Sequence, residues 1–92
     1  MIEPLFDDQH ERIYRSAFSL TDFFGGGREE LRELGWKLVH QLQVDLPDAQ
    51  PWSAYRVYEG NLVIQSRREK DVEANLARLA ILANLESVGL NF

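Results

Sequence analysis

The segment from Lys70 to Leu90 constrains the fold most, because its apolar residues do not fit on one face of a helix. At helical spacings of three and four residues, one stripe consists of Val72, Leu76, Leu79 and Ala83. A second stripe, on roughly the opposite side, consists of Ala74, Ala77, Ile81, Leu85 and Val88. A helix that is apolar on two sides must be covered on two sides, by the rest of the chain or by a second chain. The pattern therefore predicts a long C-terminal helix at the centre of the fold.

The residues at both ends of this segment match helix-end signals. The sequence Ser66-Arg67-Arg68-Glu69 fits a capping box in which Ser66 is the N-cap residue. Gly89 fits the position just after a helix, where a left-handed backbone favours glycine. Leu90 would then contact Leu85 across a Schellman turn. We expect the helix to begin just after Ser66 and to end just before Gly89.

Length and composition exclude several classes of protein. The chain has 92 residues, a net charge of −5 and no cysteine. This length predicts a single domain spanning residues 1–92, and the lack of cysteine excludes disulfides and cysteine-ligated zinc. An acidic chain is repelled by nucleic acid in general, so we expect nucleic acid to be a disfavoured partner. The absence of a signal-peptide pattern and of a membrane-length apolar run predicts a cytoplasmic protein without a membrane partner.

Two further helices are predicted before residue 47. The first begins near Pro4, ends before the three glycines at 25–27, and has on one face Phe6, Ile13, Ala17, Leu20 and Phe24. The second runs from Arg28 to Leu46 with a stripe of Leu31, Leu34, Leu38 and Leu42. Gly35 lies on this stripe, and we interpret it as allowing a close helix crossing. The glycines at 25–27 are interpreted as a turn between helices, because no preceding strand or lysine supports a phosphate-binding loop.

Residues 52–67 have the pattern of a β-hairpin. Strand-forming residues flank Gly60-Asn61, which suits a two-residue turn of the primed type. This turn would pair Val57 with Ile64 on one face and Tyr58 with Val63 on the other, with Arg56 and Gln65 beside Tyr58. An isolated hairpin is only marginally stable, so it must contact a helix or extend into a larger sheet. The predicted fold is α+β with the order α-α-β-β-α, a two-stranded antiparallel hairpin and a central C-terminal helix.

Three groups of residues are candidate binding surfaces. If the first two helices fold back on each other, an acidic patch for a partner protein would consist of Asp7, Asp8, Glu11, Glu29 and Glu30. A candidate anion or nucleic-acid site at the basic end of the hairpin consists of Arg56, Arg67, Arg68 and Lys70. The competing interpretation is that these cations pair with Glu69, Asp71 and the acidic first helix. A candidate dimer interface consists of Ala77, Ile81, Leu85, Val88 and Phe92.

The sequence supplies no constellation for catalysis, metal binding or a cofactor. Asp7, His10 and Glu11 could meet on one helix but lack a further ligand, so we predict no metal site. Catalysis by His10 or His40 would need an orienting partner and a pocket that the sequence does not indicate. Trp52 is expected in the core.

These patterns favour a non-enzymatic, acidic protein–protein interaction module. A small regulator, inhibitor or immunity-type protein that masks a partner surface is the preferred interpretation, with the partner's identity left open. The two-sided helix and the hairpin without sheet partners both predict a homodimer. The alternative function is a nucleic-acid-binding regulator that uses the basic end of the hairpin.

Overall fold

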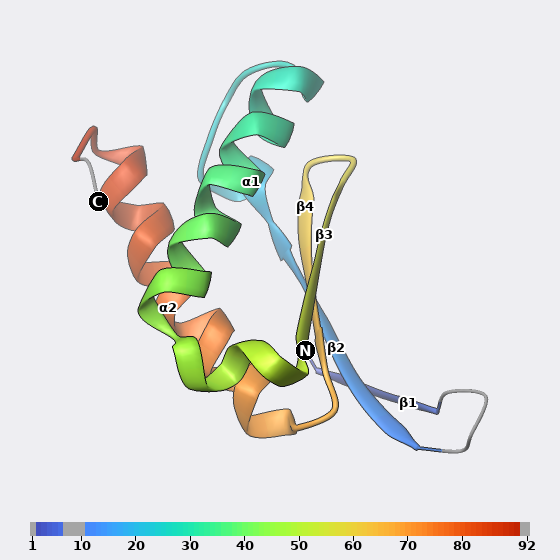
Figure 1. Ribbon diagram of the computed structural model, residues 1–92. Coiled ribbons are helices and arrows are strands. Elements are labelled where there is room, and N and C mark those ends of the chain that lie inside the picture. The colour runs from blue at the N-terminus through green and yellow to red at the C-terminus, as the bar shows by residue number, and fades with distance from the viewer. Residues whose placement is uncertain (1, 7–10, 91–92) are drawn as a thin grey trace.

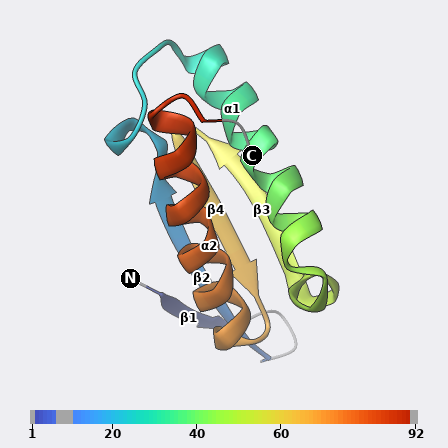
Figure 2. The ribbon, with the colours of Figure 1, turned by 90° about the vertical axis from the view of Figure 1, so that its left-hand side faces the viewer.

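A four-stranded antiparallel sheet carries two helices on one of its faces in the computed structural model, which describes residues 2–6 and 11–90 (Figures 1 and 2). The strands are β1 (Glu3–Phe6), β2 (Arg12–Ser19), β3 (Ser53–Tyr58) and β4 (Asn61–Ser66). Their order across the sheet is β1-β2-β4-β3. The helices are α1 (Arg28–Asp45) and α2 (Glu69–Ser87), and short 3-10 segments occupy Leu20–Asp22 and Pro47–Trp52. The α+β class is therefore confirmed.

The predicted order α-α-β-β-α is wrong at its first element. Residues 3–19 form the hairpin β1-β2 rather than a helix, so the order along the chain is β-β-α-β-β-α. In β2 the inward side chains alternate, with Ser16 buried and Tyr14 and Phe18 half-buried, and Leu20 directly after the strand is also buried. This period of two suits a strand, and aromatic and β-branched residues favour one. The helical stripe through Ile13 and Ala17 is a coincidence of spacing.

The second hairpin also differs in its register from the prediction. Tyr58 pairs with Asn61 and Val57 with Leu62, so the two turn residues are Glu59 and Gly60. Both have positive φ, 45° and 80°, as a type I′ turn requires. The shift of two residues in the partner preserves the predicted faces, because alternate residues share a side of the sheet. The hairpin is not an isolated pair of strands, since β4 also pairs with β2.

Helix α1 confirms the predicted second helix, but the function expected for Gly35 is wrong. Gly35 is buried against β3 rather than at a helix crossing. A Cβ at this position would lie 2.7 Å from Cγ1 of Val57 and 3.2 Å from Cδ1 of Leu20. The missing side chain therefore sets the distance between α1 and the edge of the sheet.

For α2, the predicted N-terminal cap is wrong and the predicted C-terminal turn is confirmed. The helix begins at Glu69, and its N-cap residue is Arg68 without a side-chain cap, so the assignment of Ser66 as the N-cap is wrong. Ser66 is buried and its hydroxyl oxygen accepts a hydrogen bond from the Arg68 backbone N–H. At the C-terminus, Gly89 has φ 81° and the Leu90 N–H donates to the Leu85 carbonyl at 2.9 Å. This pattern confirms the predicted Schellman turn.

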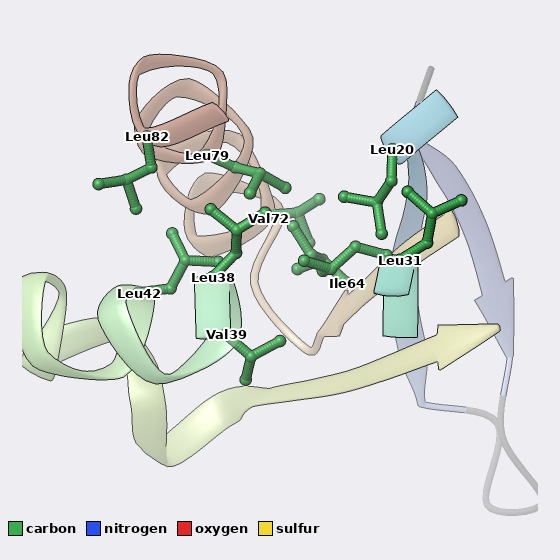
Figure 3. Close-up of a cluster of buried hydrophobic side chains, with 10 residues drawn as sticks. Leu20, Leu31, Leu38, Val39, Leu42, Ile64, Val72, Leu79 and Leu82 are labelled. Atoms are coloured by element: carbon green, nitrogen blue, oxygen red, sulfur yellow. The ribbon is translucent and has the colours of Figure 1, made fainter. Parts of the chain in front are cut away.

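The hydrophobic core fills the space between the sheet and both helices, as Figure 3 shows. Its buried members are Leu20, Leu31, Leu38, Val39, Leu42, Leu62, Ile64, Val72, Leu79 and Leu82. Helix α2 contributes one stripe to this core, and its opposite side is not covered by residues 2–6 or 11–90. Of the two expected ways of covering the second stripe of α2, the described part of the chain does not supply the first, because α1 lies beside α2 rather than over it (Figure 2).

A polar cluster closes the end of the core near residues 47–53. Asn75 is fully buried and donates to the Asp71 carbonyl at 2.8 Å. The Tyr55 hydroxyl lies 2.6 Å from the Asn75 side-chain oxygen and 3.0 Å from that of Gln50. Burial raises the pKa of Tyr55, which keeps its hydroxyl protonated as a donor. These bonds attach β3 to α2 at a place where an unpaired polar group would be costly.

Candidate functional site

The side of the helical layer that points away from the sheet carries exposed apolar side chains among charged ones, which on α1 include Glu33 and Lys37. On α1 it presents Trp36, His40 and Val44, and on α2 it presents Ala77, Ile81, Leu85 and Val88. We call these seven residues the outer helical face. Each lies roughly opposite the buried stripe of its own helix, as 3.6 residues per turn requires. Because both helices cover the same face of the sheet, their outer sides point in the same direction (Figure 1).

Four apolar side chains of this face are unusually exposed to solvent. Val44 and Val88 are each 71% exposed, Ile81 is 51% exposed and Trp36 is 40% exposed. Leu85 is half-buried. A shallow hollow of about 670 Å³ runs along α1 beside Trp36 and Val44. Contiguous apolar surface of this kind marks interaction sites on small proteins.

Two ion pairs hold the helices beside each other under this face. Lys37 Nζ lies 3.1 Å from a carboxylate oxygen of Glu86, and Arg78 Nε lies 2.9 Å from Asp45 Oδ2. The pairing shows that α1 and α2 run antiparallel. The hydrogen bond from Arg78, reinforced by one from Gln41, lowers the pKa of Asp45. The outer helical face therefore rests on a fixed helix pair.

The opposite side of the molecule is the face of the sheet that no helix covers. Its side chains include Arg15, Ala17, Ala54, Arg56, Tyr58, Val63 and Gln65, which we call the open sheet face. They line a hollow of about 680 Å³ together with Glu3, whose carboxylate lies 3.1 Å from Arg15 Nη2. The floor consists of small aliphatic groups and the edge carries arginine and tyrosine. This face is more polar than the outer helical face.

The structure does not bring the predicted acidic patch together. Glu29 and Glu30 lie in the first turn of α1, whereas Glu11 precedes β2 at the other end of the molecule (Figures 1 and 2). Asp7 and Asp8 lie outside the described residues. The patch required two antiparallel helices joined at the glycines, and the first of these is a strand pair. The predicted single acidic surface is therefore wrong for its described members.

The predicted basic cluster is also dispersed. Arg68 contacts Asp71 at 2.7 Å, the Asp48 carbonyl at 3.2 Å and the ring of Trp52. Arg67 forms an ion pair with Glu11. Lys70 is exposed in the first turn of α2. These contacts match the competing interpretation in which the cations pair within the chain.

The other residues predicted for the basic site, the core and the dimer interface lie on separate parts of the molecule. Arg56 lies on the open sheet face, separated along β3 from the other cations of its predicted group. Trp52 is 49% exposed and stacks with Arg68, so its expected place in the core is wrong. Ala77, Ile81, Leu85 and Val88 do lie together on the outer helical face. Phe92 and His10 lie outside the described residues.

Sequence reasoning missed the contributions of Arg15 and Ala17, because it assigned them to a helix. The alternation of Tyr14, Ser16 and Phe18 was the signal that could have placed their neighbours on the other side of a strand. Within residues 2–6 and 11–90, no three His, Cys, Asp or Glu side chains gather as a possible metal site. Neither helix in this part of the chain has the length and apolar character of a membrane span.

The comparisons with known proteins add no assignment. No family model, curated protein or solved structure matches the chain. The candidate surfaces are therefore defined by their geometry and chemistry.

Proposed function

We propose that the protein is a non-enzymatic protein-interaction module that forms a homodimer through its outer helical face. The observation that carries the proposal is the exposed apolar stripe of α2, with Trp36 and Val44 of α1 exposed on the same side of the helical layer. The side chains on this face are mostly aliphatic, which suits binding rather than chemistry. A role as a small regulator or inhibitor follows as part of the proposal, and the lack of cysteine suits a reducing setting such as the cytoplasm.

The size of the face suits a pair of identical chains. Helices of 18 and 19 residues are about 27 Å long at 1.5 Å per residue, and two of them side by side are about 20 Å wide. A corrugated surface of these dimensions approaches the roughly 800 Å² per partner of a standard interface. A smaller patch would support only a transient contact.

The distribution of charge favours a particular arrangement of the two copies. Between Glu73 and Glu86, the outermost side of α2 is uncharged, with Ala77, Ile81 and Asn84 exposed. The exposed side of α1 carries Glu33 and Lys37 around its apolar groups. A twofold axis parallel to the helices lays α1 of each copy over α2 of the other. This arrangement stacks no two α1 helices, and the opposite charges of Glu33 and Lys37, four residues apart on α1, can offset each other within the interface.

Sedimentation equilibrium at micromolar concentration tests the proposal. We expect a dimer for the natural chain and a folded monomer for Ile81→Asp, because burying an unpaired carboxylate in an apolar interface is strongly unfavourable. Ala54→Asp is the matched control, since it adds the same charge at an exposed position on the open sheet face. A natural chain that remains monomeric would contradict the homodimer. Dissociation by Ala54→Asp would contradict the choice of face.

A further inference from the structure

The open sheet face has a chemistry that the proposed homodimer does not use. In a dimer formed through the helices, the two sheets point outward on opposite sides, so this face stays accessible in both copies. Its floor is small and aliphatic, at Ala17, Ala54 and Val63, and its polar groups surround that floor. A surface with an even apolar floor and a polar edge suits a ligand that combines a flat group with charged groups.

The cross-strand register places the charged groups relative to one another. Arg56 on β3 is the partner of Val63 on β4, which is the partner of Ala17 on β2. In the next row of the same face, Ala54, Gln65 and Arg15 are partners. Arg56 and Arg15 are thus two strands and one row apart, or about 12 Å between Cα atoms from standard sheet spacings. Both long side chains can reach a group that lies above Val63 and Gln65.

The electrostatics of this face are opposite to those of the whole chain. The chain has a net charge of −5, whereas the face has two arginines and the single carboxylate of Glu3. Glu3 pairs with Arg15, and the Arg56 side chain has no ion pair or hydrogen bond within the described residues. A positive surface on an acidic protein selects anionic ligands locally and repels them elsewhere. An anion above Gln65 would satisfy the Arg56 guanidinium.

Tyr58 adds a second kind of contact beside these cations. Its side chain lies on the same face as Arg56, two residues along β3, and is 57% exposed. Exposed aromatic rings next to basic side chains bind single-stranded nucleic acid, because bases stack on the ring while phosphates contact the cations. The small side chains of Ala17 and Ala54 leave room for a base to approach the sheet.

We propose that the open sheet face binds a short single-stranded nucleic acid, with phosphates at Arg56 and Arg15 and a base stacked on Tyr58. The site differs from the predicted basic end of the hairpin in Arg56: at that end both Arg67 and Arg68 are paired within the chain, whereas of the two arginines on the open sheet face only Arg15 is paired within residues 2–6 and 11–90, with the exposed Glu3. Because the rest of the chain is acidic, binding is confined to a few nucleotides, and with two phosphate contacts log affinity falls against log salt with a slope of only about −1.4.

Fluorescence anisotropy with a labelled oligothymidine of about twelve nucleotides, at low salt, tests this site. We expect Arg56→Ala and Tyr58→Ala each to weaken binding by roughly tenfold. Arg56→Ala also reduces the slope of log affinity against log salt by about one. Lys70→Ala is the matched control, because it removes the same unit charge from an exposed position on α2, which covers the other face of the sheet, and it leaves affinity within about twofold.

Several outcomes would overturn the site. Absence of binding at low salt, or an equal loss in the Lys70→Ala control, would overturn it directly. Competition by poly-glutamate as effective as that by unlabelled oligothymidine would instead identify a site for any polyanion, such as an acidic peptide. Thymidine monophosphate that binds as tightly as the oligomer would identify a free nucleotide as the ligand. Ile81→Asp separates the two proposals, because a monomer that still binds the oligomer at unchanged affinity per chain supports this site alone.

Discussion

The two sides of α2 have similar apolar side chains and opposite environments. Leu79 and Val72 are fully buried against the sheet, whereas Ile81 and Val88 are more than half exposed. Composition cannot distinguish these sides, because both have aliphatic residues at helical spacing. The difference shows that one side stabilises the subunit, while the other is the exposed surface that we propose as the dimer interface.

The same division extends to α1 and to the sheet. Leu38 and Leu42 on α1 are fully buried, and Trp36 and Val44 on its outer side are not. Each layer thus has a covered face that forms the core and an uncovered face with a separate chemistry: apolar on the helices, and basic with one aromatic ring on the sheet. Substitutions on the covered faces should therefore change the free energy of unfolding, whereas those on the uncovered faces should change binding.

Leu79→Ala and Ile81→Ala give the largest contrast. Leu79→Ala leaves a cavity in the core and should lower the free energy of unfolding by about 2–5 kcal/mol. Ile81→Ala should change it by less than about 0.5 kcal/mol in dilute protein, because its side chain is already exposed. Urea unfolding at several protein concentrations measures both effects, and Ile81→Ala should instead weaken the dimer. An equal loss of stability for both variants in dilute protein would contradict the division of α2 into two sides.

Gly35→Ala probes the covered side of α1 and should have an intermediate effect. Alanine improves helix propensity by up to about 1 kcal/mol, but its Cβ would collide with both methyl groups of Val57, at 2.7 and 2.9 Å. Overpacking costs about 1–3 kcal/mol, so we expect a net destabilisation near 1 kcal/mol.

A double-mutant cycle with Val57→Ala tests whether the collision with Val57 causes the destabilisation by Gly35→Ala. Removing the methyl groups of Val57 relieves the collision, so the double variant should lose less stability than the sum of the two single variants. Gln43→Ala, exposed on the same helix, serves as the control for helix propensity and should change stability by less than about 0.5 kcal/mol. Additive effects of Gly35→Ala and Val57→Ala would show that this contact does not set the distance between α1 and β3.

The parts of the fold that sequence reasoning predicted correctly are those with local physical signals. Helix α1 has a strong stripe between glycine and proline, and the Schellman turn follows from a single glycine at residue 89. The prediction of a helix over residues 3–19 was wrong because the apolar residues of a strand can fall by chance at helical spacing. Its strand character depends on pairing with β4, which is more than forty residues away and cannot be read from local periodicity.

Among the candidate surfaces, too, the one that depends on a single helix was predicted correctly and those that depend on distant pairing were not. Ala77, Ile81 and Val88 were grouped correctly, because residues on one helix keep their relative positions whatever the rest of the chain does. The open sheet face combines Arg15 from β2 with Arg56 from β3, and only the strand order places them on one surface. The acidic patch failed for the converse reason, since its members depended on a helix pair that does not form.

The ion pair between Asp45 and Arg78 lies at the boundary between the covered and uncovered sides, and its effect should be the smallest. The hydrogen bond from Arg78 lowers the pKa of Asp45 in the folded protein. A carboxyl whose pKa is lower in the folded than in the unfolded state stabilises the fold above its unfolded pKa of about 3.9 and loses this contribution as the pH falls further. Because Arg78 is 43% exposed, solvent screening limits the contribution to under about 1 kcal/mol. Asp45→Asn should therefore be less stable than the natural chain at neutral pH, and the difference should shrink below pH about 4, measured by urea unfolding. A difference that stays constant across this range would show that the carboxylate charge at the helix boundary contributes nothing beyond packing.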